Sequence, residues 1–448
     1  MEGVTEEQEA RGRDVLGPGT GRRDPGRRDP GRRRRGGVCG PLMAAALVAL
    51  VVTVCMVLWR PFAAVPRPVP SARATLGVAV AEGTYAFMRA GQIDLAGTMG
   101  APRQLTAFAH PDRDPTHWGP IVWAPDNRHV AVAVGDPLVS RDNLGVATGV
   151  LYVVDMRSGD ARVVAPAKPG AVGVAVGPGA YAWRDGGALV FVAGGGVYAY
   201  ALAGGLATAI TGLTGSAVEV EVRGGALYYS SAALPDGPLL TLSTTLRRHD
   251  FASGHDSIVV GLGLGRFEVT GCNAVGCQAA PGVPAAVPAW DVAADGSAVA
   301  YETVTGIAPD DTSLTASFWY AALANGALSG TPARVFAAVR ATLPADTPGA
   351  CCFLRFAPDG RGLVLSSGYA MAAGFGPYLT YANPPGSAVQ VGAPWAFGPA
   401  AWTPDARGFT LVAHQRAAAN TALLNFGDQD TAILQADASD CAWAWVAE

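Results

Sequence analysis

The sequence has very little lysine and little charge of either sign for its length. Lys168 is the single lysine among 32 basic residues, and charged residues fill 15% of the 448 positions, compared with about a quarter in typical soluble domains. Residues 61–448 carry 21 basic and 29 acidic residues. Because contact with a nucleic-acid backbone requires a basic surface, this balance excludes general nucleic-acid binding by the C-terminal part.

The chain also lacks the motifs that mark common enzyme and metal-binding classes. It contains no Gly-x-Ser-x-Gly nucleophile motif,. It contains no Cys-x-x-Cys pair, and a structural zinc site needs two such pairs or nearby histidines,. Gly261, Gly263 and Gly265 lack both the third-glycine spacing and the following helix of a nucleotide-binding loop,. We therefore predict no catalytic residue, no metal and no cofactor, although the sequence leaves an enzyme open as an alternative.

One long apolar run stands near the N-terminus. Residues 38–59 carry no charge, and about 20 apolar residues are enough to span a bilayer. The run exceeds the roughly 7–15 apolar residues of a signal peptide. Residues 11–37 before it carry ten arginines, and positive residues stay on the cytoplasmic side. The run predicts one transmembrane helix in the cell membrane, with a cytoplasmic N-terminus and an extracytoplasmic C-terminal part. A cleaved signal peptide and a buried core helix are the alternatives.

The segments beside this run differ in composition from the rest of the chain. Residues 1–37 contain a GRRDP repeat that degenerates into consecutive arginines, and such charged, Pro- and Gly-broken sequence indicates a disordered tail. The tail either sets topology alone or also attracts anionic lipids. Residues 60–74 alternate proline with small residues, which predicts a semi-extended linker,. Residues 75–448 remain as one large domain.

A short phrase recurs through residues 75–448. It consists of an aromatic residue, a small residue, Pro, Asp, a turn residue and Arg, followed by alternating apolar residues. The copies are WAPDNR at 123–128, FAPDGR at 356–361 and WTPDAR at 402–407, with a degenerate VAADG at 292–296. Proline fixes φ at the first turn position, Asp bonds back to nearby backbone N–H groups, and glycine supplies a positive φ. Each copy therefore predicts a strand, a tight turn and a second strand whose aromatic residue packs between layers.

A second hairpin follows each such pair. The clearest example is LYVVDMRSGDARVV at 151–164, and seven hairpins of this kind recur along the chain. Complete first hairpins precede only six of them, which leaves TYAFM at 84–88 without an inner strand. Either LGVAVA at 76–81 or the C-terminal CAWAWV at 441–446 could fill this place. Repeated four-stranded units indicate a closed all-β array. The fold class is thus an all-β propeller with seven blades, with six and eight as alternatives.

Residues 84–448 resemble the TolB-type and WD-repeat-like β-propellers of bacterial envelopes. The resemblance is carried by the three Trp/Phe-x-Pro-Asp motifs, by the LYVVDMRSG hairpin, and by YAFMRAGQIDLAGTMGAPRQLT at 85–106. Residues 183–186 lack the proline of the motif, and residues 222–225 lack its aromatic residue. The resemblance implies a membrane-anchored envelope protein built on a propeller.

Five cysteines lie outside the apolar run. Cys272 and Cys277 flank a short loop in a Gly/Pro-rich insertion, and they are candidates for a disulfide in an oxidising compartment. Cys441 could join Cys351 or Cys352 and tie the closing strand to the sixth blade. The sequence does not choose between these pairings, and one cysteine is left over in either case.

Function is expected in the connections between strands, because binding residues concentrate on loops held by rigid scaffolds. The longest expected connections are 108–120, 135–148, 262–287, 303–316 and 339–351. The candidate recognition residues in them are His117, Trp118, Arg141, Arg266, Asp310 and Asp311. This mixed polar set favours a non-catalytic binding or scaffold module for a protein or glycan. The alternative is a lyase or hydrolase with a polar site at the propeller mouth.

Overall fold

The structure is a computed structural model of the 448-residue chain. It describes residues 83–97, 101–108, 119–135, 148–164, 174–175, 179–232, 241–266, 269–273, 276–279, 288–307, 313–342, 352–367, 378–381, 389–390, 400–413, 421–426, 431–436, 438 and 440–444. Two compact units divide the chain, Met1–Ser71 and Ala72–Glu448, and all described residues belong to the second. Within them, no helix has the length and apolar character needed to cross a membrane. The expected tail, membrane helix and linker lie outside the described residues.

The described strands form seven four-stranded antiparallel groups, here called blades 1–7. Blade 1 contains β31 (Asp440–Trp443), β1 (Thr84–Arg89), β2 (Gln92–Gly97) and β3 (Arg103–Gln104). Blade 2 contains β4 (Val122–Trp123), β5 (His129–Gly135), β6 (Thr148–Asp155) and β7 (Ala161–Val163). Blade 3 contains β9 (Tyr181–Asp185), β10 (Ala188–Ala193), β11 (Gly196–Ala201) and β12 (Ala207–Ala209). Blade 4 contains β13 (Ser216–Arg223), β14 (Ala226–Ala232), β15 (Thr241–Asp250) and β16 (Asp256–Arg266).

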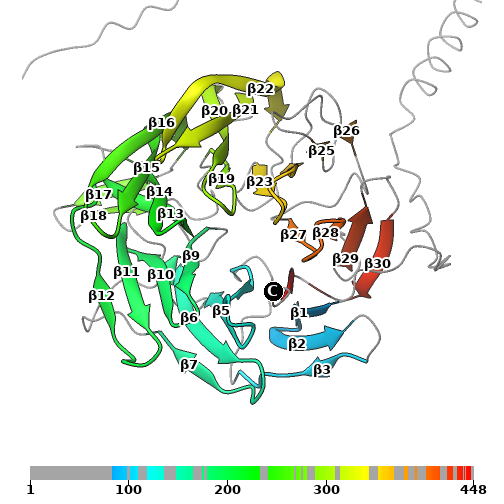
Figure 1. The fold of residues 1–448 in the computed structure, drawn as a ribbon. Helices are drawn as coiled ribbons and strands as arrows, with labels where there is room; N and C mark the ends of the chain where they lie inside the picture. Colours follow the sequence, from blue (N-terminus) through cyan, green and yellow to red (C-terminus); the bar gives the residue numbers. More distant parts are fainter. Residues whose placement is uncertain are drawn as a thin grey trace, which may run out of the picture. The chain divides into compact units, whose positions relative to one another are not determined.

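The second half of the chain repeats the pattern. Blade 5 contains β19 (Trp290–Val292), β20 (Ala298–Ile307), β21 (Ser313–Ala324) and β22 (Ala327–Thr342). Blade 6 contains β23 (Cys352–Phe356), β24 (Gly362–Ser367), β25 (Tyr378–Tyr381) and β26 (Val389–Gln390). Blade 7 contains β27 (Ala401–Trp402), β28 (Gly408–Ala413), β29 (Thr421–Phe426) and β30 (Thr431–Ala436). The blades follow one another around a centre (Figure 1), which confirms the prediction of an all-β propeller.

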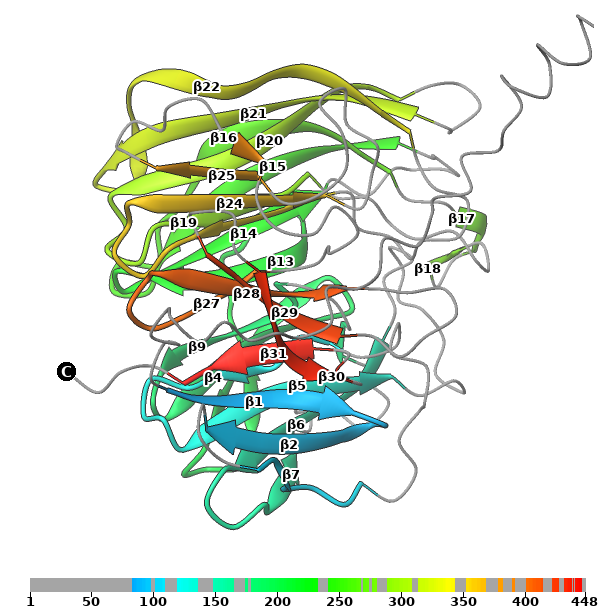
Figure 2. The same cartoon turned by 90° about the vertical axis from the view of Figure 1, so that its right-hand side faces the viewer.

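Three short strands lie outside the blades. β8 (Val174–Ala175) pairs with β6 of blade 2 and β10 of blade 3. β17 (Val269–Asn273) and β18 (Gly276–Ala279) form a separate hairpin between blades 4 and 5, which lies at one end of the ring in Figure 2. The insertion at 262–287, expected as a connection, thus contains the end of β16 and this hairpin. Strands β20, β21 and β22 likewise extend into the expected connections at 303–316 and 339–351.

The hydrophobic core is divided into clusters that lie between neighbouring blades. One cluster joins blades 2, 3 and 4, and others join blades 1 and 2, 4 and 5, 5 and 6, 6 and 7, and 7 and 1. In blade 7, for example, Trp402 and Phe409 pack against Ala357 and Val364 of blade 6. Each sheet therefore buries both faces against its neighbours, which explains the continuous apolar runs in the middle strands.

The recurring phrase forms the same turn in all four copies. Its aromatic residue ends the inner strand and is buried, as for Trp123, Phe356 and Trp402. The Asp Oδ1 accepts the N–H two residues later at 2.8–3.1 Å in each copy. The residue after the Asp has a positive φ in each copy: Asn127, Gly296, Gly360 and Ala406. The predicted strand–turn–strand geometry is confirmed, and the phrase specifies it even where glycine is replaced.

The ring is closed by the two ends of the domain. β31 pairs with β1 in antiparallel register, with Trp443 opposite Tyr85 and Cys441 opposite Phe87. The C-terminal segment therefore fills the inner place of blade 1, and LGVAVA at 76–81 lies outside the described residues. Closure removes an open sheet edge that could recruit another chain. Trp445, expected on the same strand, also lies outside the described residues.

Blades 4 and 5 are joined by a backbone contact that depends on one glycine. Gly263 of β16 pairs with Val304 of β20 in parallel. Its φ is +82°, and a Cβ placed there would stand 2.2 Å from the Val304 carbonyl oxygen. The joint therefore requires a residue without a side chain.

Replacing Gly263 with alanine should destabilise the propeller by about 2–4 kcal/mol, because strain at positive φ adds to steric overlap with backbone. Chemical denaturation followed by tryptophan fluorescence measures this loss. Gly261 is the matched control: it lies on the same strand, and a Cβ there meets nothing within 4 Å. Equal stability of G263A and G261A would show that the contact at Val304 is unimportant.

Candidate functional site

The inner strands of adjacent blades are connected by carboxylates that accept the next blade's backbone N–H groups. Glu221 of β13 accepts Val292 N at 3.1 Å through Oε2. Asp291 of β19 accepts Phe356 N at 2.6 Å through Oδ2. Asp440 accepts Ile121 N at 2.5 Å in the same way between blades 1 and 2. An inner strand has no further strand to pair with, so these side chains satisfy buried donors that would otherwise lack a partner.

Indole N–H groups make a second set of contacts between blades. Trp123 Nε1 donates to Ala442 O at 3.1 Å, and Trp183 Nε1 donates to Val122 O at 2.9 Å. Trp402 Nε1 donates to Arg355 O at 3.2 Å. The aromatic residues of the inner strands thus link blades by hydrogen bonds as well as by packing.

The junction of blades 4, 5 and 6 concentrates charge. Arg355 of β23 donates through Nη1 to Asp291 Oδ1 at 2.9 Å, and the same nitrogen lies 3.6 Å from Glu221 Oε1. Arg223 Nη2 also pairs with Glu221 Oε1. The Asp291 side chain is 2% exposed, whereas the Arg355 side chain is 30% exposed. The network holds three blades together and leaves part of one guanidinium accessible.

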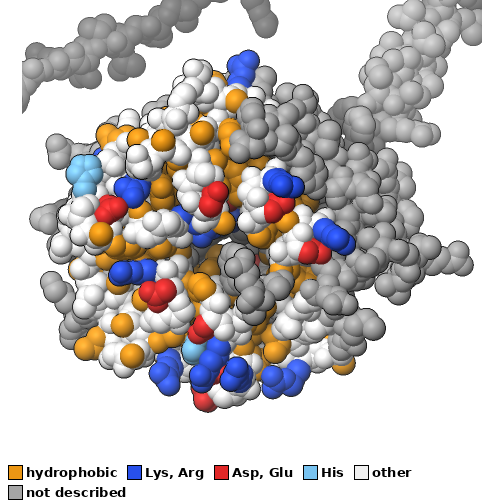
Figure 3. All heavy atoms as spheres, in the orientation of Figure 1, with side chains coloured by type: hydrophobic (Ala, Val, Ile, Leu, Met, Phe, Trp, Pro, Cys, Tyr) orange, Lys and Arg blue, Asp and Glu red, His pale blue; other side chains and the backbone are white. Residues whose placement is uncertain are grey.

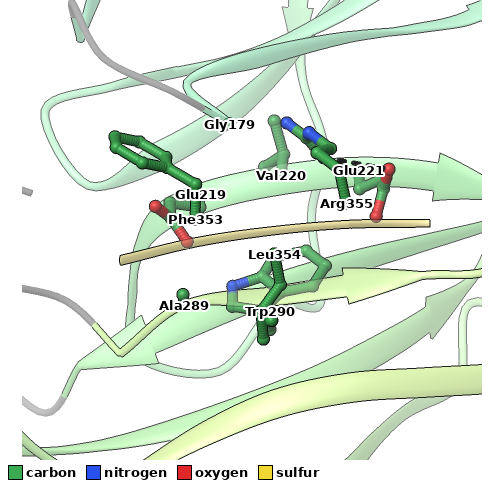
Figure 4. A pocket seen from close by; sticks show the side chains of 9 residues that line it. All are labelled: Gly179, Glu219, Val220, Glu221, Ala289, Trp290, Phe353, Leu354 and Arg355. Carbon is green, nitrogen blue, oxygen red and sulfur yellow. Dashed lines mark ion pairs between the residues drawn. The ribbon is translucent and has the colours of Figure 1, made fainter. Parts of the chain in front are cut away.

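A pocket lies beside this junction. Its enclosed space is about 30 Å³, within a wider hollow of about 370 Å³ that includes open solvent, and it is lined by inner-strand residues of blades 4, 5 and 6 together with Gly179 before β9. Figure 4 shows the lining: Glu219, Val220 and Glu221 come from β13, Ala289 and Trp290 from β19 and the residue before it, and Phe353, Leu354 and Arg355 from β23. Acidic, basic and aromatic side chains therefore meet at one place on the propeller.

On the face shown in Figure 3, several Lys and Arg side chains gather along the lower edge. Acidic and basic side chains stand next to one another at several places around the ring, with a hollow near the centre. Among the described residues, the pocket is the more specific feature.

Three carboxyls of the inner strands, two at this junction and Asp440 between blades 1 and 2, have raised pKa values. Burial raises the pKa of Glu219 to about 8; nearby Glu221 and Glu302 raise it further, while Arg355 and Trp290 lower it. Burial raises the pKa of Glu221 to about 7, against the lowering effect of Arg223 and Arg355. Burial raises the pKa of Asp440 to about 6. Carboxyls perturbed in this way within a cleft are typical of functional sites, although structural networks also produce them.

These shifts predict that the propeller loses stability as the pH rises from about 4.5 to 8. The folded pKa of each carboxyl lies above its unfolded value, so the unfolded chain binds fewer protons in this window and stability falls with pH. Glu219→Gln should remove the part of this pH dependence that extends up to pH 8. The expected change in the free energy of unfolding is on the order of 1–2 kcal/mol after allowance for solvent screening. Thermal unfolding at pH 5 and pH 8.5 compares the two proteins. Asp295→Asn in the exposed turn of blade 5 is the control, and an unchanged slope in E219Q would contradict the assignment.

The expected recognition residues are not those that form this site. Arg266 is the last residue of β16. His117, Trp118, Arg141, Asp310 and Asp311 lie outside the described residues, so their role stays a prediction. No group of three or more His, Cys, Asp or Glu side chains suited to a metal ion occurs in the described part of the chain.

The cysteines divide into two cases. Cys272 and Cys277 face each other in the register of β17 and β18, and their disulfide stays a prediction. Cys441 is a free, buried thiol, which corrects the suggested bond to Cys351 or Cys352. The reason is its place on β31: it packs in the core between blades 7 and 1 with Tyr85 and Phe87, where a thiol behaves as a small apolar residue.

The sequence reasoning missed Glu219, Glu221 and Arg355. A signal was present in SAVEVEVR at 216–223, where two carboxylates occur two residues apart in an apolar strand. Such residues share one face of a strand, and carboxylates in this setting need partners. The partners of Glu221 in the next blades, Val292 and Arg355, lie 71 and 134 positions further along the chain, so the pattern alone does not name them.

No protein-family model and no curated protein matches the chain. Among solved structures it is similar to TolB from Acinetobacter baumannii, with 14% identity, 81% of this chain and 66% of that chain covered, and a TM-score of 0.40. It is also similar to a putative TolB from Agrobacterium tumefaciens (12% identity, 80% and 90% covered, TM-score 0.37) and to the β-propeller domain of the Trilobed protease from Pyrococcus furiosus (9%, 71% and 84%, TM-score 0.40). The chain covers just under two thirds of the first TolB. The matches include TolB proteins, which the repeats resemble, while the propeller assignment stands on the strand pairing itself.

Proposed function

We propose that the chain is a non-catalytic binding or scaffold module, a β-propeller that recognises a protein or glycan outside the membrane. The observation that carries this proposal is the pocket between the inner strands of blades 4, 5 and 6, where polar groups converge on a ring closed by its own ends. A rigid frame that presents a few convergent polar groups in a concave site is typical of ligand binding.

The chemistry of the pocket favours binding over catalysis. No serine, cysteine or histidine occurs among the nine described residues that line it. Glu221 is already engaged by Val292 N and Arg223, and the Nη1 of Arg355 is engaged by Asp291. A carboxylate nucleophile or acid such as Glu219 needs a second positioned acid or base, and the other charged groups of the described lining, Glu221 and Arg355, are engaged by the contacts between blades.

The proposal includes a membrane anchor. Its support is the uncharged run at 38–59 and the arginines that precede it, since such a run after a basic segment inserts with its N-terminus in the cytoplasm. Protease added to intact cells should then remove the domain at 75–448 and leave the N-terminal tail. Protection of the domain would reverse the orientation.

Site-specific photo-crosslinking in the native cells tests the binding function. A crosslinker in place of Phe353, half-buried at the pocket, should give a discrete adduct with one partner. Ile258, 59% exposed on the outermost strand of blade 4, is the control position and should give none. Equal labelling at both positions, or no adduct at Phe353, would argue against a partner at the pocket. Turnover of a small substrate that is lost in E219Q would favour the lyase or hydrolase instead.

A further inference from the structure

Glu219 is the carboxylate that the blade junction does not use. Its backbone N–H donates to Ser230 Oγ at 3.1 Å, but its side chain forms no ion pair within 4 Å with any described residue. Glu221, two residues along the same strand, has Arg223 as its partner. Glu219 therefore lies in the pocket without an ion pair of its own, and Arg355 favours its ionised form only from beyond ion-pair distance.

Trp290 supplies a second unused group. It is 7% exposed, and its Nε1 has no hydrogen-bond partner among the described residues. Figure 4 shows the indole nitrogen on the side of the ring that faces Glu219. Its N–H favours the ionised form of that carboxyl, but the two groups do not meet at hydrogen-bond geometry. Trp123, Trp183 and Trp402 all have acceptors. A buried N–H without an acceptor costs about 1–3 kcal/mol, so a ligand that brings an oxygen to Trp290 would recover this energy.

Two further groups complete the pocket. Arg355 uses only Nη1 in its contacts with described carboxylates, and its side chain is 30% exposed. Phe353 adds a half-buried aromatic wall on the same side of β23. The pocket thus offers one unpaired carboxyl, one unpaired indole donor and an apolar surface.

We propose that this pocket binds an ammonium group that stands next to a carbonyl or carboxylate oxygen, with Glu219 as the counter-ion and Trp290 Nε1 donating to the oxygen. This inference rests on the proposed binding function and names its ligand chemistry. Two sources carry this group: a free α-amino acid and the amino terminus of a peptide. The first carries a full negative charge, which suits a lining that also contains the part-exposed guanidinium of Arg355; the second carries a neutral carbonyl oxygen.

The protonation of the site follows from the charges around Glu219. Glu221 on the same strand and Glu302 on β20 disfavour its ionised form, and Arg355 on β23 favours it; Arg223 and Asp291 act on Glu221. A bound ammonium adds the missing positive charge, so Glu219 releases its proton when the ligand binds. Binding should therefore weaken as the pH falls below the raised pKa of Glu219.

Calorimetry with the full-length protein in detergent tests the ligand class. The probes are L-alanine, L-alaninamide, N-acetyl-L-alaninamide, which lacks the ammonium, and n-propylammonium, which lacks the oxygen. At pH 8 we expect binding of L-alanine, L-alaninamide or both, at least tenfold weaker binding of propylammonium, and none of the acetylated probe. L-Alanine favoured tenfold over L-alaninamide identifies a free amino acid, and comparable binding of the two identifies a peptide terminus.

Two variants separate the roles. E219Q should lower, at least tenfold, the affinity for whichever of L-alanine and L-alaninamide binds. It should also abolish the more than tenfold fall in affinity that we expect for the unmodified protein between pH 8 and pH 6. W290F should weaken the oxygen-bearing probes without changing propylammonium, and D295N is the control. Binding of the acetylated probe, or equal binding by E219Q with an unchanged melting temperature, would overturn the inference. A crosslinked partner at Phe353 without ammonium binding would leave the proposed function standing and reject only this ligand class.

Discussion

Removal of residues 440–448 is expected to open the propeller and convert the protein into an aggregating species. The deletion removes β31 and with it the pairing to β1. It also removes buried Trp443, whose Nε1 donates to Thr410 Oγ1 at 2.8 Å, and Asp440, which accepts Ile121 N. Both neighbours of blade 1 thus lose contacts, and β1 becomes an exposed sheet edge. Size-exclusion chromatography in detergent and limited proteolysis should show loss of the monomeric, protected domain.

A shorter deletion is the matched control. Removing 445–448 keeps every described residue of β31 and should leave a protected domain. If the 440–448 deletion also remained monomeric and protease-resistant, closure by the C-terminal strand would be irrelevant to stability. The contacts among the other strands would then be enough to keep the propeller folded without β31.

Asp291→Ala is expected to give the largest loss of stability among single substitutions at the junction, about 3 kcal/mol or more. Removing one partner of a buried ion pair typically costs about 3–5 kcal/mol, and in this case the Arg355 guanidinium keeps only the longer contact to Glu221, at 3.6 Å. Here the loss affects both the Arg355 guanidinium and the Phe356 N–H. Urea denaturation followed by tryptophan fluorescence measures the change.

Asp295→Ala provides the comparison within the same blade. This exposed turn residue accepts Ser297 N at 2.9 Å, and its loss should cost about 1 kcal/mol or less. The double variant Asp291→Ala/Arg355→Met should lose less stability than the sum of the losses of its two single variants. The reason is that it no longer contains the Arg355 guanidinium, which loses its closest carboxylate in Asp291→Ala. Additive losses would show that the two side chains do not act as a pair.

The fold was largely predictable from local sequence. The phrase from Trp123 to Arg128 encodes a turn through proline, Asp and a positive-φ residue, and all four copies adopt it. These interactions reach only two or three residues along the chain, so their residue types and spacing specify them. The unmatched hairpin at the start and the apolar segment at the end likewise predicted closure, because a ring leaves no inner strand unpaired.

The candidate site depended on contacts that no local pattern encodes. Glu219, Trp290 and Arg355 come from three different blades, and only the packing of inner strands places them around one pocket. The same applies to Cys441: the sequence allowed a disulfide to Cys351 or Cys352, whereas the structure has a free thiol in the core, on β31 opposite Phe87. Sequence alone therefore determined the repeating unit, since turns and alternation act over a few residues. The tertiary structure alone decided which carboxyl is left without a partner, since burial and pairing depend on neighbours more than 60 residues away.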